Sequence, residues 1–359
     1  MATVVIVGGG YGGVATAKAL DDIADVVLVE PKDAFVHNIA ALRGLVDPEW
    51  TDRVFYPYGR LLSRGRVIKD RAARVEAGAV TLGSGERIAA DYIVLASGST
   101  YPFPAKMDVN DTATAKSKIA DTRAELIKAD RVLLLGAGPV GLELSGEIKA
   151  AWPDKAVTIV DPIDDVLSGQ YSDAMRKELR RQLEDLGVNL LLGTSLTEEP
   201  HTPAGMTSTF TAATASGEEI TADIWFRCYG VVPNSDYLSE DLAQARLANG
   251  HLDVSPELRL AGQETVFAVG DLTAIPEAKR GGAAGRHAEV AAGNIRALIE
   301  GGDLAAYQPA PPLILLPLGP TGGVSQLPGQ DDFGGPEITA QIKGRDMFAD
   351  RYAELLNLT

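Results

Sequence analysis

The sequence predicts an α/β protein built from two parallel-sheet units, with a small α+β region toward the C-terminal end. An apolar segment, a glycine-rich turn and a helical segment follow one another at residues 4–19 and again at residues 132–151. Each apolar segment lacks alternating polar residues, which is typical of a parallel strand covered on both faces. With 359 residues, the chain is long enough for two or three domains of about 100–200 residues each.

The first unit lies at the N-terminal end of the sequence. Residues 4–7 form a predicted strand, and Gly8–Gly13 supplies a G-x-G-x-x-G turn that leads into a helix of small residues. A second apolar strand, 26–29, is followed by the acidic residue Glu30. The order strand, turn, helix and strand predicts a βαβ unit with two adjacent parallel strands.

The second unit repeats this order. Residues 132–135 form a predicted strand, and Gly136–Gly141 matches the same glycine pattern. The helix that follows is expected to end before Pro153, because proline cannot continue a helix. The next strand, 157–160, is followed by Asp161. Two βαβ units of one kind are therefore predicted in one chain.

Further apolar segments extend this α/β pattern. Residues 93–99, 224–234 and 266–271 each read as a strand that ends in a turn of small or polar residues. The proline-rich segment 308–312 predicts a linker. The remaining residues contain a strand-like segment, a glycine turn and a terminal amphipathic helix, which together predict the small α+β region.

The repeated turn has a clear chemical meaning. In a G-x-G-x-x-G turn the first glycine makes the tight bend, the second lets the backbone approach a phosphate, and the third lets helix and strand pack closely. The helix N-terminus adds free N–H groups and a partial positive charge. Glycine is abundant, at 38 residues, so a single match would be weak evidence. Two matches, both between a strand and a helix, predict two dinucleotide sites.

The position of each site indicates which dinucleotide it takes. We expect the N-terminal site to hold FAD, with Glu30 on the ribose, and the second site to hold the exchangeable nicotinamide cofactor. There Asp161 is expected to bind the adenosine ribose, and no arginine follows it before Arg176. Asp164 and Asp165 would repel a 2′-phosphate, so NADH is favoured over NADPH.

Candidate cofactor-binding residues follow from these motifs, from the turns after the other strands and from the segments quoted below. Asp271, after the apolar strand that starts at Val266, is a carboxylate that can accept hydrogen bonds from ribityl hydroxyls. The full set of candidates is Gly8, Gly10, Tyr11, Gly12, Gly13, Glu30, Pro31, Lys32, Asn38, Arg43, Ala96, Ser97, Gly98, Gly136, Gly138, Pro139, Val140, Gly141, Asp161, Gly230, Gly270 and Asp271.

The ordered motifs carry a family resemblance that covers nearly the whole chain. Gly8–Gly13, Ala96–Ser99, Gly136–Glu143, Gly230–Asn234 and Phe267–Asp271 together resemble the FAD-dependent pyridine nucleotide oxidoreductases. The resemblance implies two Rossmann-like domains of the glutathione-reductase type and a bound FAD that accepts a hydride from NAD(P)H.

The same resemblance implies domain boundaries. A discontinuous FAD-binding domain would comprise residues 1–106 and 241–307, and an NAD(P)H-binding domain would comprise residues 107–240. Residues 308–359 would form the small C-terminal α+β domain.

Three segments resemble a narrower group. Residues 30–43, 98–104 and 287–295 look like the apoptosis-inducing factor 2 group, which includes the ferroptosis suppressor proteins. That resemblance implies an NAD(P)H:quinone oxidoreductase, a flavoprotein that passes two electrons on to a quinone. One departure concerns Ala2, which cannot accept the N-terminal myristate that the animal proteins carry. Contact with a membrane surface would then have to come from the C-terminal region. Whether the chain forms a homodimer stays open.

Three residues are candidates for roles near the reaction. Glu143 matches a family glutamate at the nicotinamide end of the cofactor, and an ordinary first-turn glutamate is the alternative. His37 is a candidate to lie by the flavin and protonate a reduced quinone, because imidazole titrates near neutrality. His287 lies on the helix whose N-terminus faces the flavin in this superfamily. For both histidines a structural role is the alternative.

Composition narrows the partners and the chemistry. The net charge of −16 disfavours nucleic acid as a partner, and no metal site is expected. The single cysteine, Cys228, excludes an intrachain redox dithiol. No signal peptide is apparent, so a cytoplasmic location is expected. Two other functions stay open: a ferredoxin reductase, and a redox-sensing interaction protein in which NADH binding shifts the oligomeric state.

Overall fold

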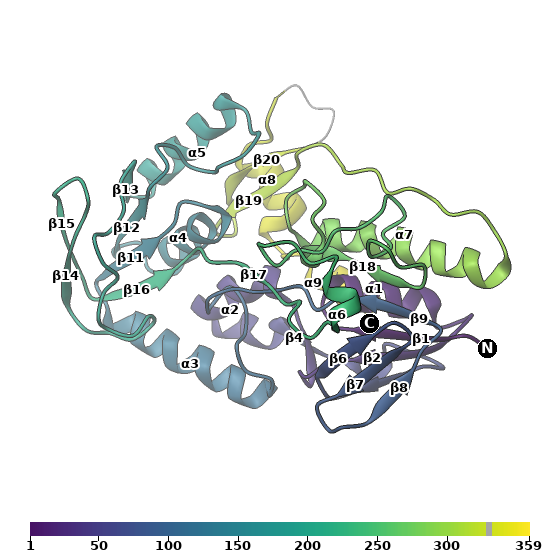
Figure 1. Ribbon diagram of the computed structural model, residues 1–359. Coiled ribbons are helices and arrows are strands. Elements are labelled where there is room, and N and C mark those ends of the chain that lie inside the picture. Colours follow the sequence, from purple (N-terminus) through teal and green to yellow (C-terminus); the bar gives the residue numbers. More distant parts are fainter. Residues whose placement is uncertain (328–331) are drawn as a thin grey trace.

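The computed structural model describes residues 1–327 and 332–359 of the chain. It is a mixed α/β structure with two parallel sheets that lie in different parts of the molecule (Figure 1). The first sheet has the strand order β18-β9-β1-β2-β5, and every neighbouring pair in it is parallel. Its strands are β1 (Thr3–Val7), β2 (Asp25–Val29), β5 (Arg66–Ile68), β9 (Tyr92–Leu95) and β18 (Val266–Ala268).

Both faces of the first sheet are covered, which explains the unbroken apolar strands. On one face Val4 and Ile6 pack with residues of α1 (Tyr11–Leu20) and α7 (Gly281–Glu300). On the other face Val5 and Val7 pack against an antiparallel sheet of β6 (Ala72–Glu76), β7 (Ala79–Leu82) and β8 (Arg87–Ala89). Helices α1 and α7 therefore lie next to each other on one side of this sheet.

The second sheet has the order β13-β12-β11-β16 and is also parallel. Its strands are β11 (Arg131–Leu135), β12 (Ala156–Asp161), β13 (Val188–Leu192) and β16 (Ile224–Arg227). Helices α3 (Thr112–Lys128), α4 (Pro139–Ala151) and α5 (Asp173–Asp185) contribute to the core on one face. The hairpin of β14 (Phe210–Ala213) and β15 (Glu219–Ala222) covers the other.

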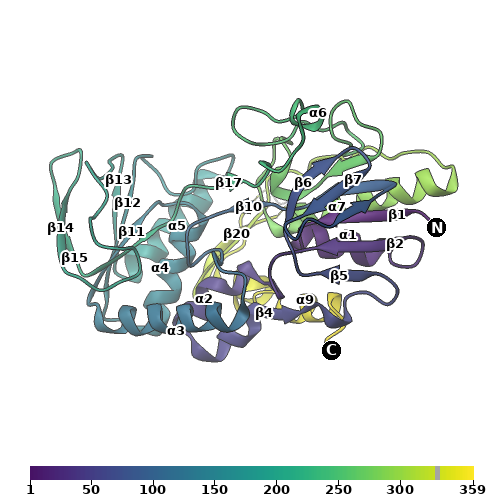
Figure 2. The ribbon, with the colours of Figure 1, turned by 60° about the horizontal axis from the view of Figure 1, so that its bottom comes forward.

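Short elements connect the two units. An antiparallel pair of β10 (Ser99–Thr100) and β17 (Val232–Pro233) lies between the sheets (Figure 2). The other short elements lie in residues 34–60 and 240–272. They are β3 (Ala34–Val36), η1 (Asn38–Ala40), α2 (Ala41–Val46), η2 (Pro48–Val54), β4 (Phe55–Pro57), η3 (Tyr58–Arg60), α6 (Glu240–Ala243) and η4 (Gly270–Leu272).

The C-terminal segment contacts both units. It contains the hairpin of β19 (Ile314–Leu318) and β20 (Gly322–Gln326), then α8 (Pro336–Thr339), a π-helical turn η5 (Ala340–Gly344) and α9 (Ala349–Leu355). The hairpin packs on α4 closely enough that a Cβ on Gly146 would lie 2.5 Å from the Cα of Leu318. Tyr352 of α9 belongs to the core of the first unit. Among the described residues, no helix is long and apolar enough to cross a membrane.

Candidate functional site

Both predicted glycine turns have the geometry that a phosphate site needs. Gly8 has a φ of +105°, and a Cβ on it would lie 2.5 Å from the carbonyl oxygen of Ala96. A Cβ on Gly13 would lie 1.8 Å from the oxygen of Gly8, so no side chain fits there. A Cβ on Gly10, by contrast, would meet no atom of the described residues within 4 Å, so there is open space at the start of α1.

The second turn repeats these three features. Gly136 has a φ of +118°, and its Cβ would lie 2.8 Å from the oxygen of Cys228. A Cβ on Gly141 would lie 2.0 Å from the oxygen of Gly136, while the space around Gly138 is open. Pro139 and Val140 begin α4, where a proline at the first position removes no helical hydrogen bond.

Helices α1 and α4, which follow these turns, differ from α3 and α5 in how their N-termini are capped. Their N-cap residues, Gly10 and Gly138, have no side chain that could cap the first-turn N–H groups. In α3 and α5 these groups are capped, because Asp111 accepts from the N–H of Thr114 and Ser172 from that of Met175. The N-termini of α1 and α4 therefore keep donors for an anionic ligand.

The two acids after the second strands occupy equivalent positions. Glu30 accepts a hydrogen bond of 2.6 Å from the backbone N–H of Gly9 and one of 2.9 Å from that of Lys32. Asp161 accepts from Ala137, at 2.6 Å, and from Ile163, at 2.8 Å. In both units the carboxylate thus joins the residue after the first glycine to the residue two positions beyond itself.

Asp271 lies beside a lysine that no sequence motif identifies. The Lys106 ammonium lies 3.0 Å from its carboxylate, and the Ser99 hydroxyl donates to the same oxygen at 2.6 Å. Burial raises the pKa of Asp271, but the nearby Lys106 charge and the Ser99 hydrogen bond outweigh it, and the net pKa is below the ordinary value. Asp271 is therefore ionised at neutral pH.

Other residues predicted to contact a cofactor lie in the turns between the units. Ala96 lies against Gly8, and the Ser97 hydroxyl hydrogen-bonds with that of Tyr237 at 2.6 Å. Gly98 and Gly230 have positive φ values of 61° and 99°, with open space around each. The buried Oδ1 of Asn38 finds no hydrogen-bond partner among the described residues, so it is available to a ligand. Pro31 lies between Glu30 and Lys32 in their hydrogen-bonded loop.

His287 is held inside the first unit rather than facing open space. Its Nδ1 accepts from the N–H of Gly270 at 3.0 Å, and its Nε2 lies 2.6 Å from the Glu277 carboxylate. The ring is 1% exposed and packs edge-on against Tyr307. Burial lowers the pKa of His287 below its ordinary value. The imidazole therefore fixes the turn that carries Asp271.

His37 is also fully buried. Its Nε2 lies 2.8 Å from the carbonyl oxygen of Met347, which requires a proton on Nε2. Its Nδ1 therefore accepts a hydrogen bond from the Tyr11 hydroxyl at 3.1 Å. The Tyr11 oxygen in turn accepts a hydrogen bond from the backbone N–H of Ile39. Burial lowers the pKa of His37 to about 4. At neutral pH this imidazole is neutral and both nitrogens are engaged.

The depressed pKa of His37 predicts acid sensitivity. Between its ordinary pKa of 6.5 and its folded pKa of about 4, the unfolded chain binds more protons. The free energy of unfolding therefore falls as pH drops through this window. Over the whole window, the protonation of this one histidine lowers it by about 3 kcal/mol. Unfolding measured from pH 7 to pH 4 should show a shallower loss in His37→Gln. The exposed His201→Gln should retain the wild-type slope, and equal slopes in all three proteins would contradict the prediction.

Glu143 and Arg43 belong to one buried network of ion pairs. Arg43 of α2 meets Glu147 of α4 at 2.7 Å, and it also donates to the carbonyl of Gly344. One turn earlier on α4, Glu143 pairs with Lys343 of the C-terminal segment at 2.7 Å. The network joins the first unit, α4 and the C-terminal segment. The four-residue spacing of the two glutamates places both on one helix face, but no sequence signal identifies their distant partners.

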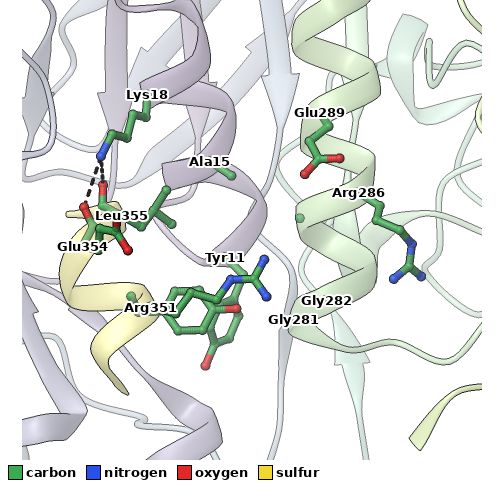
Figure 3. Close-up of a pocket in the computed structure, with 12 residues that line it drawn as sticks. Tyr11, Ala15, Lys18, Gly281, Gly282, Arg286, Glu289, Arg351, Glu354 and Leu355 are labelled. Carbon is green, nitrogen blue, oxygen red and sulfur yellow. Dashed lines mark hydrogen bonds between the residues drawn. The ribbon is translucent and has the colours of Figure 1, made fainter. Parts of the chain in front are cut away.

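A cavity of about 360 Å³ lies between α1, α7 and α9 (Figure 3). Tyr11 and Ala15 of α1 line it on one side, and α7 contributes the glycines at its N-terminal end. Arg351 and Tyr352 of α9 close it on a third side. The sequence motifs do not indicate that α9 residues lie at this place.

The geometry agrees with similarities to known proteins. The sequence profile of the pyridine nucleotide-disulphide oxidoreductase family matches residues 2–293. Ferroptosis suppressor protein 1 of Taeniopygia guttata is 31% identical over 355 residues, covering 97% of this chain and 94% of that protein. Apoptosis-inducing factor homolog B of Dictyostelium discoideum is 29% identical, covering 99% and 96%.

A solved structure extends the fold likeness. The sulfide:quinone oxidoreductase of Aquifex aeolicus superposes with a TM-score of 0.76 at 17% identity, covering 100% of this chain and 92% of that one. Cys228, the single cysteine, is buried, and burial raises its pKa to about 12. At neutral pH its side chain is therefore a protonated thiol and not the reactive thiolate. The resemblance expected from the sequence is confirmed: the chain belongs to the pyridine nucleotide-disulphide oxidoreductase family, in the group of the ferroptosis suppressor and apoptosis-inducing factor homologues.

Proposed function

We propose that the protein is an FAD-dependent NADH:quinone oxidoreductase. The observation that carries this proposal is the pair of equivalent glycine turns, each with an uncapped helix N-terminus and a carboxylate in the same position. We assign FAD to residues 1–106 and 241–307 and the nicotinamide nucleotide to residues 107–240, with 308–359 as a C-terminal domain.

The residues of the first unit fit FAD. The open space at Gly10 and the N–H groups of α1 suit a pyrophosphate, and Glu30 suits a ribose. Asp271 and the Oδ1 of Asn38, which no described residue bonds, add acceptors for hydroxyl or ring N–H groups. When bound, FAD accepts a hydride from the nicotinamide and passes two electrons to the acceptor. The chain's own contribution is to bind, orient and separate the two nucleotides.

The basic residues near Asp161 favour NADH. Arg176 donates to the carbonyls of Val166, Leu167 and Tyr171, so its guanidinium is committed to holding its own loop. Arg180 pairs with Asp165 at 3.1 Å. Both arginines are thus engaged elsewhere than with a 2′-phosphate, whereas the Asp161 carboxylate suits a ribose 2′-hydroxyl.

Removing that carboxylate should change the nucleotide preference. In Asp161→Ser we expect the ratio of kcat/KM for NADPH to that for NADH to rise about tenfold, mainly because NADH loses its ribose contact. Steady-state kinetics with both nucleotides would measure this ratio. The exposed Asp164→Ser, in the same loop, should move it less. A ratio that stays constant in Asp161→Ser would remove this basis for NADH preference.

We propose Glu143, His37 and His287 as site residues that also hold neighbouring parts of the site in position. Lys343 holds the Glu143 carboxylate at the start of α4, where the nicotinamide nucleotide would enter. His287 fixes the Gly270 turn, and His37 fixes Tyr11. In these neutral tautomers, neither imidazole offers a proton to an acceptor in open space.

A quinone is the acceptor that we propose. The overall reaction is NADH + H⁺ + quinone → NAD⁺ + quinol, in which both electrons leave NADH as a hydride. The chain lacks the dithiol that disulfide reduction requires, and its net charge of −16 does not favour an acidic protein acceptor such as a ferredoxin. Relatives at about 30% identity are ferroptosis suppressor proteins, which supports the same group of reactions.

An anaerobic titration of the purified protein tests this proposal. We expect a visible flavin band that bleaches with about one equivalent of NADH and returns on addition of a soluble quinone. A protein without flavin, even after incubation with FAD, would overturn the assignment of the first unit. A reduced flavin that ignores quinones, combined with a change of oligomeric state on NADH addition, would favour the redox-sensing alternative instead.

A further inference from the structure

A buried carboxylate lies close to the turn that carries Asp271. The Glu277 side chain is 6% exposed, and three side chains are directed to it. The Nε2 of His287 lies 2.6 Å from its Oε1, and the Tyr307 hydroxyl donates to its two oxygens at 2.9 and 3.0 Å. Arg286 adds a hydrogen bond of 3.3 Å. Burial of a carboxylate is unfavourable unless its oxygens are hydrogen-bonded, so these donors fix its position.

One of these donors comes from the connection to the C-terminal segment. Residues 301–313, which we call the strap, lead from the end of α7 back along this helix toward β19 (Figure 1). Asn294 of α7 anchors the strap, because its amide accepts from the backbone N–H of Ala305 and donates to the carbonyl of the same residue. Two residues later, the Tyr307 hydroxyl reaches Glu277. The strap thus meets the buried carboxylate at a fixed point.

We propose that Tyr307 and Glu277 are positioning residues for the flavin cofactor, which act on Asp271 through His287. The inference rests on the proposed function, because Asp271 is the carboxylate that we assign to the hydroxyls of FAD. It adds to the site two residues from outside the cofactor motifs, one of which belongs to the strap. The hydrogen-bond series Tyr307–Glu277–His287–Gly270 connects them to the turn.

Glu277 determines which nitrogen of His287 carries the proton. A carboxylate oxygen 2.6 Å from Nε2 requires the N–H at Nε2. Nδ1 then keeps its lone pair and accepts the backbone N–H of Gly270 at 3.0 Å. The other tautomer would direct two N–H groups at each other. The carboxylate therefore fixes both the tautomer and the orientation of the ring.

Gly270 in turn determines where Asp271 lies. Gly270 has a φ of +71°, and a Cβ on it would lie 3.2 Å from the Cβ of Ala284 on α7, so the turn is tightly held against this helix. At Asp271, the Ser99 hydroxyl and the Lys106 ammonium both donate to Oδ2. None of the described residues donates to Oδ1. The series therefore ends at a carboxylate oxygen that is available to a ligand hydroxyl.

Protonation of His287 would break this series. A proton on Nδ1 leaves no lone pair for the N–H of Gly270, so the turn has to move and the cofactor is held less tightly. Burial lowers the pKa of His287, the Glu277 charge raises it, and the charges of Lys279 and Arg286 lower it, with a net pKa below the ordinary value. The imidazole is therefore neutral at neutral pH, and FAD is expected to be released as the pH falls through this pKa.

Two variants should move this acid-induced release in opposite directions. Glu277→Gln keeps an acceptor for His287 but removes the charge that raises its pKa, so release should occur at a lower pH than in the wild type. Tyr307→Phe keeps the ring but takes one donor from the carboxylate, which favours the protonated imidazole, so release should occur at a higher pH. A purely structural loss would move both variants to higher pH. The fluorescence of released FAD, followed as the pH is lowered, gives each midpoint.

Affinity at neutral pH gives a second readout. We expect Tyr307→Phe to raise the Kd for FAD about fivefold, because a hydrogen bond to a charged group is lost. Tyr229→Phe is the matched control, since it removes a tyrosine–glutamate hydrogen bond, to Glu199, in the second unit. It should leave both the Kd and the midpoint unchanged. His287→Gln carries an amide that does not titrate, so it should not release FAD over the pH range in which the wild type does.

The outcomes separate this inference from the proposed function. A wild-type protein that binds no FAD overturns both. If the wild type binds FAD but Glu277→Gln and Tyr307→Phe have the wild-type midpoint, or both shift to higher pH, only the positioning role is overturned. Release from His287→Gln at the wild-type pH would overturn it as well, and this result does not depend on the folding of the other two variants.

Discussion

Gly138→Val should yield a protein that keeps its flavin but is no longer reduced by NADH. Gly138 is the N-cap of α4, with an ordinary φ of −79°, and a Cβ there meets no described atom within 4 Å. Valine is therefore tolerated by the chain, yet it occupies the space where the α4 N–H groups would meet a pyrophosphate. We expect the apparent affinity for NADH to fall at least about 100-fold. Stopped-flow bleaching of the flavin measures it.

The equivalent variant in the first unit provides the matched control. Gly10 is the N-cap of α1, with a φ of −77° and equally open surroundings. Gly10→Val should be purified without flavin, whereas the Gly138→Val flavin should still be reduced by dithionite. The reverse pattern, with flavin lost from Gly138→Val and retained in Gly10→Val, would show that the two nucleotides have been assigned to the wrong units.

The second large effect concerns the Arg43–Glu147 pair. Both side chains are almost fully buried, at 3% and 2% exposure, so removing one leaves an unpaired charge in the interior. Such a loss costs about 3–5 kcal/mol. We therefore expect Arg43→Met to lower the free energy of unfolding by that amount. Burial already raises the pKa of Glu147 despite the opposing charge of Arg43, which indicates how unfavourable this position is for an isolated carboxylate.

Replacing both partners should restore most of the stability. The double variant Arg43→Met/Glu147→Leu buries no charge, and apolar replacements of a buried pair are often neutral or stabilising. Denaturant unfolding of the FAD-loaded proteins measures both effects. The exposed pair Arg66–Asp25, at 54% and 44% exposure, is the control, and Arg66→Met should change stability by less than about 1 kcal/mol. A double variant as unstable as Arg43→Met would mean that the pair is not the cause.

Local sequence was sufficient to predict the parts of the site that lie within one βαβ unit. A strand, a glycine turn, a helix and a terminal acid are close in sequence, and their geometry follows from steric limits on glycine and from strand pairing. Glu30 and Asp161 thus lie where their spacing predicted, each within hydrogen-bonding distance of its own glycine turn.

Contacts between distant segments could not be predicted in this way. Lys106 pairs with Asp271 across 165 residues of chain, and Lys343 pairs with Glu143 across 200. The sequence motifs suggest Arg43 as a cofactor contact, but the structure engages its guanidinium with Glu147 and Gly344. A charged residue in a sequence has many partners to choose from, and only the packing of α2, α4 and η5 decides between them.

The sequence by itself determined the fold class, the family and the two nucleotide-type turns, because these depend on short-range patterns of apolar residues and glycine. The tertiary structure decided the state of the two histidines, the ion-pair network and the cavity beneath α9. Those features depend on burial and on which side chains meet, and both arise only after the two units and the C-terminal segment have packed together.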